Sequence, residues 1–330
     1  MEKRILIDLN DKANWLYEST SPPTPEGHIM EENRVILMPE GEHKLFAFTD
    51  AVMHHVPGMT GNEHVHHKGY ETFFVDSGSL DFYSMGKVCT LKKGDLYHLP
   101  PYVTHGMVFH EDTRYRGIFQ DWAILDNFHE TFELRRRLPE VADRMNRPPE
   151  GEAPPVMDFS AMDMHIREKY NCERVEPEAI PAVRNPARPL NRFDFDGVVM
   201  KQMVGRWECN GVREIWRAEM TKGFYAEWDE TPDYPELFYV TEGRIKFKVY
   251  DEEFIAYEDC LVRIPKYAPR YLEAETDAAM YDILGLPSWY EFLHDYTGMM
   301  QNNPDRAKDE AVMRRLKTAT KCAIKSIGMK

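Results

Sequence analysis

Residues 61–78 read GNEHVHHKGYETFFVDSG, and this stretch decides how the chain is interpreted. His64 and His66 are two positions apart, so on a β-strand both side chains point to the same face. Four residues separate His66 from Glu71, which is enough for a turn that brings a second strand alongside. Gly78 then closes a hairpin. The pattern predicts two histidines and a glutamate gathered on neighbouring strands.

A second stretch, GDLYHLPPYVTHGMVF at residues 94–109, adds His105 from a different strand. Three imidazoles and one carboxylate directed into one cavity form a site for a divalent first-row metal, with exchangeable positions left for water or substrate. His67 follows His66 directly and points to the opposite face of a strand, so we do not expect it to be a ligand.

The chain contains an internal repeat of segments whose residues are typical of β-strands. Short segments rich in Val, Phe, Tyr and Leu alternate with Gly, Pro, Asp and Ser from Val35 to about Trp122, and again from Phe193 to Leu286. A shift of 165 residues aligns the two regions without a gap and pairs Glu71 with Glu236, Phe73 with Phe238, Val75 with Val240, Gly78 with Gly243, Phe82 with Phe247, Leu96 with Leu261, Pro100 with Pro265 and Tyr102 with Tyr267. The chain is therefore predicted to contain two copies of one β fold.

The first copy resembles the cupin superfamily, and the repeat resembles its two-domain members, the bicupins. The family's first motif is a glycine, HxH, three or four residues, a glutamate, six residues and a glycine. Its second motif is a glycine, five residues, a proline, one residue, a glycine, two residues and a histidine. The matching residues are His64, His66, Glu71, Gly78, Gly94, Pro100 and His105. Tyr102 and Tyr267 replace the second motif's second glycine, and Phe109 stands at its final asparagine.

The resemblance implies a mainly β fold with two cupin barrels (double-stranded β-helix or jelly roll), a helical linker and C-terminal helices. The helices are expected at about 130–146 and 160–170 and after residue 288, with the proline-rich RPPEGEAPP between the first two. The expected parts are an N-terminal arm at 1–29, a metal-binding barrel at 30–129, a helical and proline-rich linker at 130–190, a second barrel without metal ligands at 191–287 and a helical tail at 288–330.

The second copy departs from the metal-binding pattern. The same shift replaces the three histidines, in order, by Asp229, Thr231 and Arg270, and keeps the glutamate as Glu236. Arginine is not a metal ligand because its guanidinium stays protonated near neutral pH. We expect Arg270 to pair with Glu236, since a buried unpaired carboxylate is costly. This degenerate site is either a scaffold or a second substrate site.

Candidate pocket residues follow from strand alternation around the ligands. The residues expected to face the cavity are Phe73, Val75, Met107 and Phe109, with Tyr83, His98 and Trp122 on adjoining strands. A wall of methionine and aromatic side chains suits a flat or apolar organic substrate. Core packing explains most of these residues equally well.

The composition excludes several classes of function. The 330 residues include 41 Lys and Arg against 56 Asp and Glu, a net charge of −15 that argues against a nucleic-acid or membrane-surface partner. No apolar run approaches the roughly 20 residues of a membrane span, and no signal peptide is recognised. Five scattered cysteines fit a reducing cytoplasm. The expected partners are a small-molecule substrate and, from the resemblance, a second copy in a homodimer.

The resemblance implies a metal-dependent enzyme with one divalent transition metal per chain, Fe or Mn favoured and Ni, Cu or Zn possible. The segment around Glu71 looks like that of quercetin-dioxygenase-like cupins of type 2. The first expectation is therefore an oxidoreductase, a dioxygenase that cleaves a ring or C–C bond of an aromatic or enolic substrate. Glu71 would act there as ligand or as catalytic base. The alternatives are a non-redox lyase, isomerase or decarboxylase, and a non-catalytic ligand-binding cupin.

Overall fold

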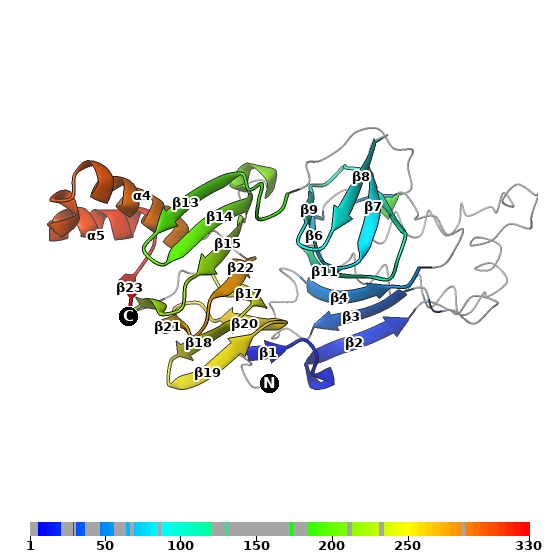
Figure 1. The fold of residues 1–330 in the computed structure, drawn as a ribbon, viewed down its shortest axis with the longest axis horizontal. Coiled ribbons are helices and arrows are strands. Elements are labelled where there is room, and N and C mark those ends of the chain that lie inside the picture. Colours follow the sequence, from blue (N-terminus) through cyan, green and yellow to red (C-terminus); the bar gives the residue numbers. More distant parts are fainter. Residues whose placement is uncertain are drawn as a thin grey trace, which may run out of the picture. The chain divides into compact units, whose positions relative to one another are not determined.

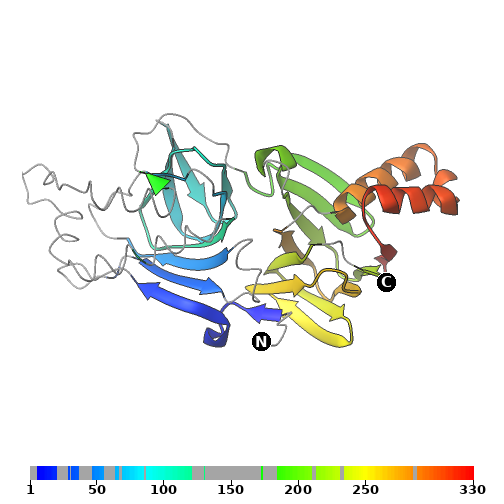
Figure 2. The same cartoon turned by 180° about the vertical axis from the view of Figure 1, so that it is seen from behind.

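The computed structural model is shown from opposite sides in Figures 1 and 2. The residues that it describes are 6–20, 29, 31–36, 47–55, 64–66, 69–84, 87–120, 130, 172–173, 184–209, 213–230, 234–284 and 288–330. The chain divides into two compact units. The first unit holds Ala13–Asn185, and the second holds Glu2–Lys12 together with Pro186–Lys330.

The described elements of the first unit are β-strands, preceded by a 3₁₀ turn at Lys12–Asn14. The strands are β2 (Trp15–Thr20), β3 (Glu31–Ile36), β4 (Ala47–Met53), β5 (Val65–His66), β6 (Glu71–Ser77), β7 (Ser79–Ser84), β8 (Lys87–Lys92), β9 (Leu96–Leu99), β10 (Gly106–Phe109), β11 (Thr113–Phe119) and β12 (Cys172–Glu173). They form a six-stranded sheet in the order β2-β3-β4-β11-β6-β9, a three-stranded sheet β10-β7-β8 and the pair β12-β5.

The described residues of the second unit form strands, two α-helices and two 3₁₀ turns. Its elements are β1 (Leu6–Asp8), β13 (Asn191–Phe195), β14 (Val198–Val204), η2 (Arg206–Cys209), β15 (Ile215–Met220), β16 (Phe224–Trp228), β17 (Glu236–Glu242), β18 (Arg244–Val249), β19 (Glu252–Tyr257), β20 (Cys260–Ile264), β21 (Arg270–Ala274), β22 (Ala278–Asp282), α4 (Ser288–Asn302), η3 (Arg306–Lys308), α5 (Glu310–Ala319) and β23 (Ile324–Met329). The sheets run β1-β20-β17-β22-β15-β14-β13 and β19-β18-β21-β16-β23.

The two units repeat one topology, as the 165-residue shift predicts. The order β3-β4-β11-β6-β9 of the first matches β14-β15-β22-β17-β20 of the second. Residue register is kept as well, because Phe73 pairs with Gly117 and its counterpart Phe238 pairs with Asp282. Alternating apolar residues on these strands face inward, so each unit encloses its own hydrophobic core. The predicted mainly β fold with two barrels is confirmed.

The hairpin glycines occupy matching conformations in the two units. Gly78 has φ 75° and Gly243 has φ 74°, in the left-handed region that favours glycine. A Cβ built on Gly78 would lie 2.4 Å from the carbonyl oxygen of Asp112, and one on Gly243 would lie 2.2 Å from that of Asp277. The two turns therefore require glycine both for the backbone angle and for the close approach of a neighbouring strand.

Residues 1–29, expected as an arm, contribute a strand to each unit. Strand β1 lies at the edge of the second unit's large sheet, where Ile7 pairs with Leu261. The Tyr257 hydroxyl donates to Asp8 at 2.6 Å across this edge. Strand β2 pairs with β3 in the first unit as β13 pairs with β14 in the second. The first repeat therefore begins before residue 30.

A returning strand follows each barrel. In the first unit β12 pairs with β5, the strand that carries His66, and in the second unit β23 pairs with β16 at the matching position. The expected tail is helical over α4 and α5 and ends in this strand. Asp309 is the N-cap of α5, because its side chain accepts a hydrogen bond from the backbone N–H of Ala311 at 2.8 Å. The helices expected between 130 and 170 lie outside the described residues.

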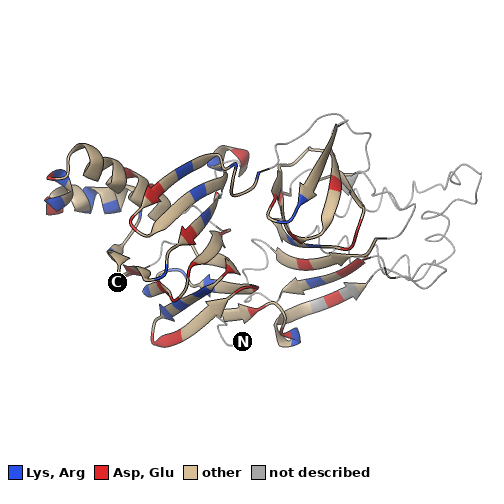
Figure 3. Cartoon of the chain, viewed as in Figure 1, with Lys and Arg blue, Asp and Glu red and all other residues tan. Residues whose placement is uncertain are grey.

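Basic and acidic residues are both scattered over the described strands of each unit (Figure 3). Among the described residues, none of the helices combines the length and the apolar composition that a membrane crossing requires.

Candidate metal centre

The three histidines come together because two short backbone segments pair. The backbone N–H of His64 donates to the carbonyl of His105 at 2.9 Å, and the N–H of His105 donates to the carbonyl of His64 at the same distance. Strand β5 then carries His66, and β6 begins at Glu71. The two strands belong to different sheets, β5 to the pair with β12 and β6 to the six-stranded sheet, so Glu71 is not on a strand paired with that of His66 as the spacing predicts.

The four side chains converge on one point. The ring centroids of His64 and His105 are 4.3 Å apart, and those of His64 and His66 are 4.8 Å apart. One nitrogen of each histidine lies within 4.8 Å of the others, a spacing at which the three could hold one ion. Glu71 completes the set, because its Oε1 lies 3.0 Å from Nε2 of His66 and its Oε2 lies 3.0 Å from Nε2 of His105.

Three of the four donor residues are buried, while His64 is half-buried, and two of them leave bonding capacity for a cation. His66, Glu71 and His105 are each at most 4% exposed. In the described part of the chain, neither ring nitrogen of His66 nor either oxygen of Glu71 makes a hydrogen bond of regular geometry, although they lie close together. Buried polar atoms without regular bonds are costly. A divalent cation would satisfy one ring nitrogen of His66 and the carboxylate of Glu71, so these residues fit a metal ion.

Protonation also suits metal binding. The Nδ1 of His105 lies 3.0 Å from the carbonyl oxygen of Val103, an arrangement that places a proton on Nδ1 and leaves the Nε2 lone pair toward the centre. Burial by itself would raise the pKa of the Glu71 carboxyl, but His66 and His105, when they are protonated, attract the carboxylate and hold that pKa well below its ordinary value. Glu71 is therefore an ionised carboxylate near neutral pH.

An aromatic wall borders the centre. The ring of Phe82 lies parallel to that of His105, with centroids 5.9 Å apart. Phe73 is buried and makes edge contacts with Tyr115 at 5.6 Å. Burial, with the charges of Glu31 and Glu71, raises the pKa of Tyr115, so this phenol keeps its proton. Of the other residues expected here, Val75 is in the same core, and Met107 and Phe109 pack against it partly buried.

The structure does not bring Tyr83 and His98 to this wall. Phe82 belongs to the core, and alternation along β7 turns Tyr83 to the other face. His98 faces away in the same manner, and its Nδ1 lies 2.9 Å from the Thr72 hydroxyl. Alternation shows which residues share a face, but the inward face of these two strands depends on pairing that the sequence does not display. Trp122, Thr231 and His67 lie outside the described residues.

The second barrel holds an ion pair at the equivalent position. Arg270 contacts Glu236 through both ends of its guanidinium, with Nη2 to Oε1 at 2.8 Å and Nη1 to Oε2 at 2.6 Å. Both side chains are fully buried. The guanidinium also lies over the ring of Trp228, 4.1 Å from its centroid. Asp229 directly follows Trp228, and its backbone N–H donates to the carbonyl of Ala323 at 3.0 Å.

Two features of the second barrel were missed by sequence reasoning. Asp282 is a second buried carboxyl beside the pair, at the position of Gly117 in the first barrel, and burial together with the charge of Glu236 raises its pKa well above the ordinary value. Trp289 and Tyr290 at the start of α4 are fully buried in this core, and Trp289 packs edge-on against Trp228 at 5.4 Å. The aromatic run SWY at 288–290 was the available signal.

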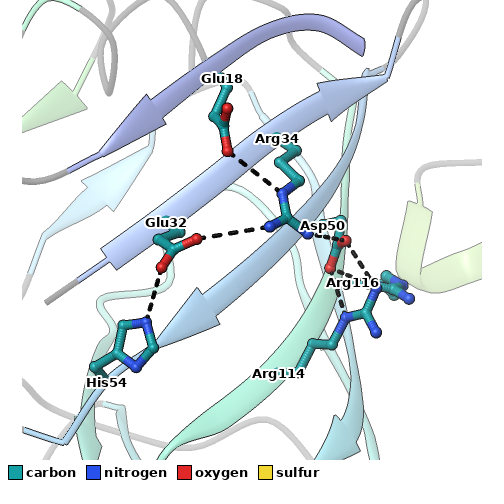
Figure 4. Close-up of polar contacts among 7 residues, drawn as sticks. All are labelled: Glu18, Glu32, Arg34, Asp50, His54, Arg114 and Arg116. Carbon is teal, nitrogen blue, oxygen red and sulfur yellow. Dashed lines mark hydrogen bonds and ion pairs between the residues drawn. The ribbon is translucent and has the colours of Figure 1, made fainter. Parts of the chain in front are cut away.

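Figure 4 shows another charged group, on the six-stranded sheet of the first unit. Ala51 belongs to the barrel core, so its neighbour Asp50 points to the other face, where it is 1% exposed. Asp50 contacts Arg34 at 3.3 Å and Arg114 at 2.9 Å, and it also contacts Arg116. This network ties β3, β4 and β11 together and is separate from the histidine cluster.

The comparisons with known proteins agree with this fold. The family model of the cupin domain matches residues 51–119. No curated protein sequence matches the chain. Similar solved structures include a tryptophan-to-phenylalanine variant of oxalate decarboxylase from Bacillus subtilis, with 12% identity, a TM-score of 0.55 and coverage of 92% of this chain and 85% of that chain. A structure of that enzyme from a study of its Mn(II) centres has 11% identity, a TM-score of 0.54 and the same coverage.

The matched cupin domain spans the histidine cluster, and the structural likeness extends over both barrels. Residues 51–119 thus match the cupin domain, and the two units together have the fold of a two-domain cupin structure. At this identity the likeness to oxalate decarboxylase concerns the fold, and the chemistry of this chain has to be argued from its own residues.

Proposed function

We propose that the first barrel binds one divalent transition metal ion through His64, His66, His105 and Glu71, and that the protein is a metal-dependent lyase that decarboxylates a small organic acid. The observation that carries this proposal is the cluster of three histidines, with Glu71 3.0 Å from His66 and from His105 and with buried atoms of His66 and Glu71 that make no regular hydrogen bond. When bound, the ion supplies Lewis-acid chemistry that polarises a carboxylate or carbonyl oxygen. Three imidazoles and a carboxylate suit Mn(II) or Fe(II), and the Mn(II) centres of the structural relative support manganese.

Glu71 and the histidines have distinct tasks in this proposal. Glu71 is ionised and lies between His66 and His105, so it serves as a ligand or accepts a proton from the substrate. The bond from His105 Nδ1 to Val103 fixes the orientation of that imidazole. The apolar wall on the other side excludes water and strengthens every electrostatic interaction inside the barrel.

The lining favours a substrate with an apolar or aromatic body beside the carboxylate that the metal would bind. The core cluster of this barrel contains Phe73, Phe82 and Tyr115, and Met107 and Phe109 pack against it partly buried. Such side chains give apolar contacts to a carbon skeleton.

A dioxygenase is the second candidate function. The observation in its favour is the aromatic character of the core beside the donor set, which suits a planar aromatic or enolic ligand. The two candidates use the same ligands and differ in whether O₂ is consumed. The expected homodimer and cytoplasmic location stay predictions.

The test is a stoichiometry measurement on the full-length protein loaded with Mn(II). Benzoylformate, an aromatic 2-oxo acid, and oxalate are supplied, and CO₂ release and O₂ uptake are recorded together. The lyase proposal predicts CO₂ from benzoylformate in preference to oxalate, without equivalent O₂ uptake. One O₂ consumed per substrate would replace the lyase by the dioxygenase. The matched controls are His66→Ala in the site and His110→Ala, an exposed histidine that pairs with Asp81.

A further inference from the structure

A separate pocket lies in the second unit, between strands β13 to β15 and helix α4, which Figure 1 shows beside β13. Its volume is about 610 Å³, a size that suits a small organic ligand. The inner wall is the stacked pair Trp216 and Tyr290, whose rings are 5.0 Å apart and nearly parallel. Nothing in the proposed metal chemistry of the first barrel uses this pocket.

An exposed tryptophan stands at the rim. Trp207, in the 3₁₀ turn η2, lines the pocket and is 67% exposed. Its ring folds back over Gly205, where a Cβ would lie only 2.5 Å from the indole. The Glu208 carboxylate accepts from the Gly205 backbone N–H at 2.8 Å and holds the loop. A large ring is thus positioned at the mouth of the pocket by its backbone instead of being buried in a core.

The charge of the lining is negative. Glu214, Glu291 and Asp295 all line the pocket, and the last two are four residues apart on one face of α4. Glu214 is buried and accepts from the indole N–H of Trp216 at 2.6 Å. Arg206 contacts both Glu214 and Glu291, so one guanidinium serves two carboxylates.

The remaining charges do not cancel this excess. Arg192 lines the pocket but is bonded to Asp194 at 3.2 Å. Asp295 lies 3.2 Å from Nδ1 of the neighbouring His294. An aromatic pocket with surplus carboxylate charge attracts a cation both through the ring faces and through the carboxylates.

We infer that this pocket binds a small organic cation, an amine or quaternary ammonium compound, with the cationic head between the Trp207 ring and the carboxylates of α4. A planar aromatic face attracts an alkylammonium head through its quadrupole, and tryptophan does so best. The site is independent of the metal centre. It gives the second unit a ligand-binding role although its barrel position for a metal is filled by an arginine.

The test uses choline as the cation and 3,3-dimethylbutan-1-ol as its neutral counterpart of the same shape, in calorimetric titrations of the full-length protein. Choline should bind once per chain, and the neutral alcohol at least about tenfold more weakly. Trp207→Ala and Asp295→Asn should each weaken choline binding by about tenfold. Both positions are exposed, so thermal unfolding should stay unchanged.

Two controls keep the outcome specific. Tyr250→Ala removes another exposed aromatic residue that does not line this pocket, and it should leave choline affinity unchanged. His66→Ala should also leave it unchanged, which separates this pocket from the metal centre. Absence of choline binding up to about 20 mM, equal binding of the neutral alcohol, or loss of choline binding in His66→Ala would each overturn the inference.

Discussion

In the first barrel Glu71 faces three histidines, whereas in the second barrel its counterpart Glu236 faces Arg270. Both glutamates are buried at the start of equivalent strands, and both need a positive charge beside them. The second barrel contains that charge in its own covalent structure. The first barrel has three imidazoles instead. In their neutral form they can bind a metal cation, which then supplies the positive charge beside Glu71. A metal site and a structural ion pair are thus two solutions to the same electrostatic problem.

The surroundings of the two glutamates also differ, because bulky side chains fill the space beside Glu236 in the second barrel. In the second barrel the space near Arg270 is filled by Trp228 and Trp289, and Asp282 adds a carboxyl. In the first barrel the residue at the position of Asp282 is Gly117, which has no side chain. One barrel is therefore packed for stability, and the other keeps a donor set for a ligand.

The largest effect is expected for His66→Ala. Removing one imidazole from the donor set should lower metal-dependent activity by at least about 100-fold, since even residues behind the ligands cost 10–100-fold. Activity is measured after loading with Mn(II), beside the control His110→Ala, which should keep wild-type activity. Full activity in His66→Ala would mean that the histidine cluster of the first barrel is not the active site.

Arg270→Ala tests the other side of the comparison. Breaking a buried pair leaves Glu236 without its cation, and the expected loss of unfolding free energy is about 3–5 kcal/mol. Replacing both partners, as Arg270→Met with Glu236→Leu, should be close to neutral because neither member of the pair is left buried without its partner. Urea unfolding of the three proteins measures this. Equal destabilisation by the single and the double change would mean that the loss of unfolding free energy does not come from leaving Glu236 unpaired.

Matched glycine variants compare the two hairpins. Gly78→Ala and Gly243→Ala should each destabilise by about 1–3 kcal/mol, because the left-handed φ is strained and the Cβ meets a carbonyl oxygen. The midpoint of urea unfolding reports the loss. If one of the two variants were as stable as the parent, the equivalence of the hairpins would fail.

The smallest effect concerns Tyr102 and Tyr267. They have φ 65° and 62° and are 69% and 56% exposed, so each bears backbone strain and buries little of its ring. Tyr102→Gly and Tyr267→Gly should stabilise by up to about 1 kcal/mol. Tyr102→Ala and Tyr267→Ala keep the strain and should give no gain. The midpoint of thermal unfolding of the glycine variant is compared with that of the alanine variant at each position.

The metal donors and the repeat were predictable because both depend on spacing within one strand or one hairpin. The two tyrosines that replace motif glycines adopt the glycine-like φ, so the turn survives the substitution. The pairing of β1 with β20 was not predictable, because it joins residues more than 250 positions apart. Tyr83 and His98 were assigned to the wrong face for the same reason, since their orientation depends on partners that the local sequence does not reveal.

The central claim is that one barrel binds a metal ion and the other has replaced it by an arginine. Its most direct test is the metal content per chain of the full-length protein after Mn(II) loading and removal of excess ion. One ion per chain is expected in the wild type and in the Arg270→Met, Glu236→Leu protein, and none in His66→Ala. Two ions per chain in the wild type, or one ion retained in His66→Ala, would contradict it.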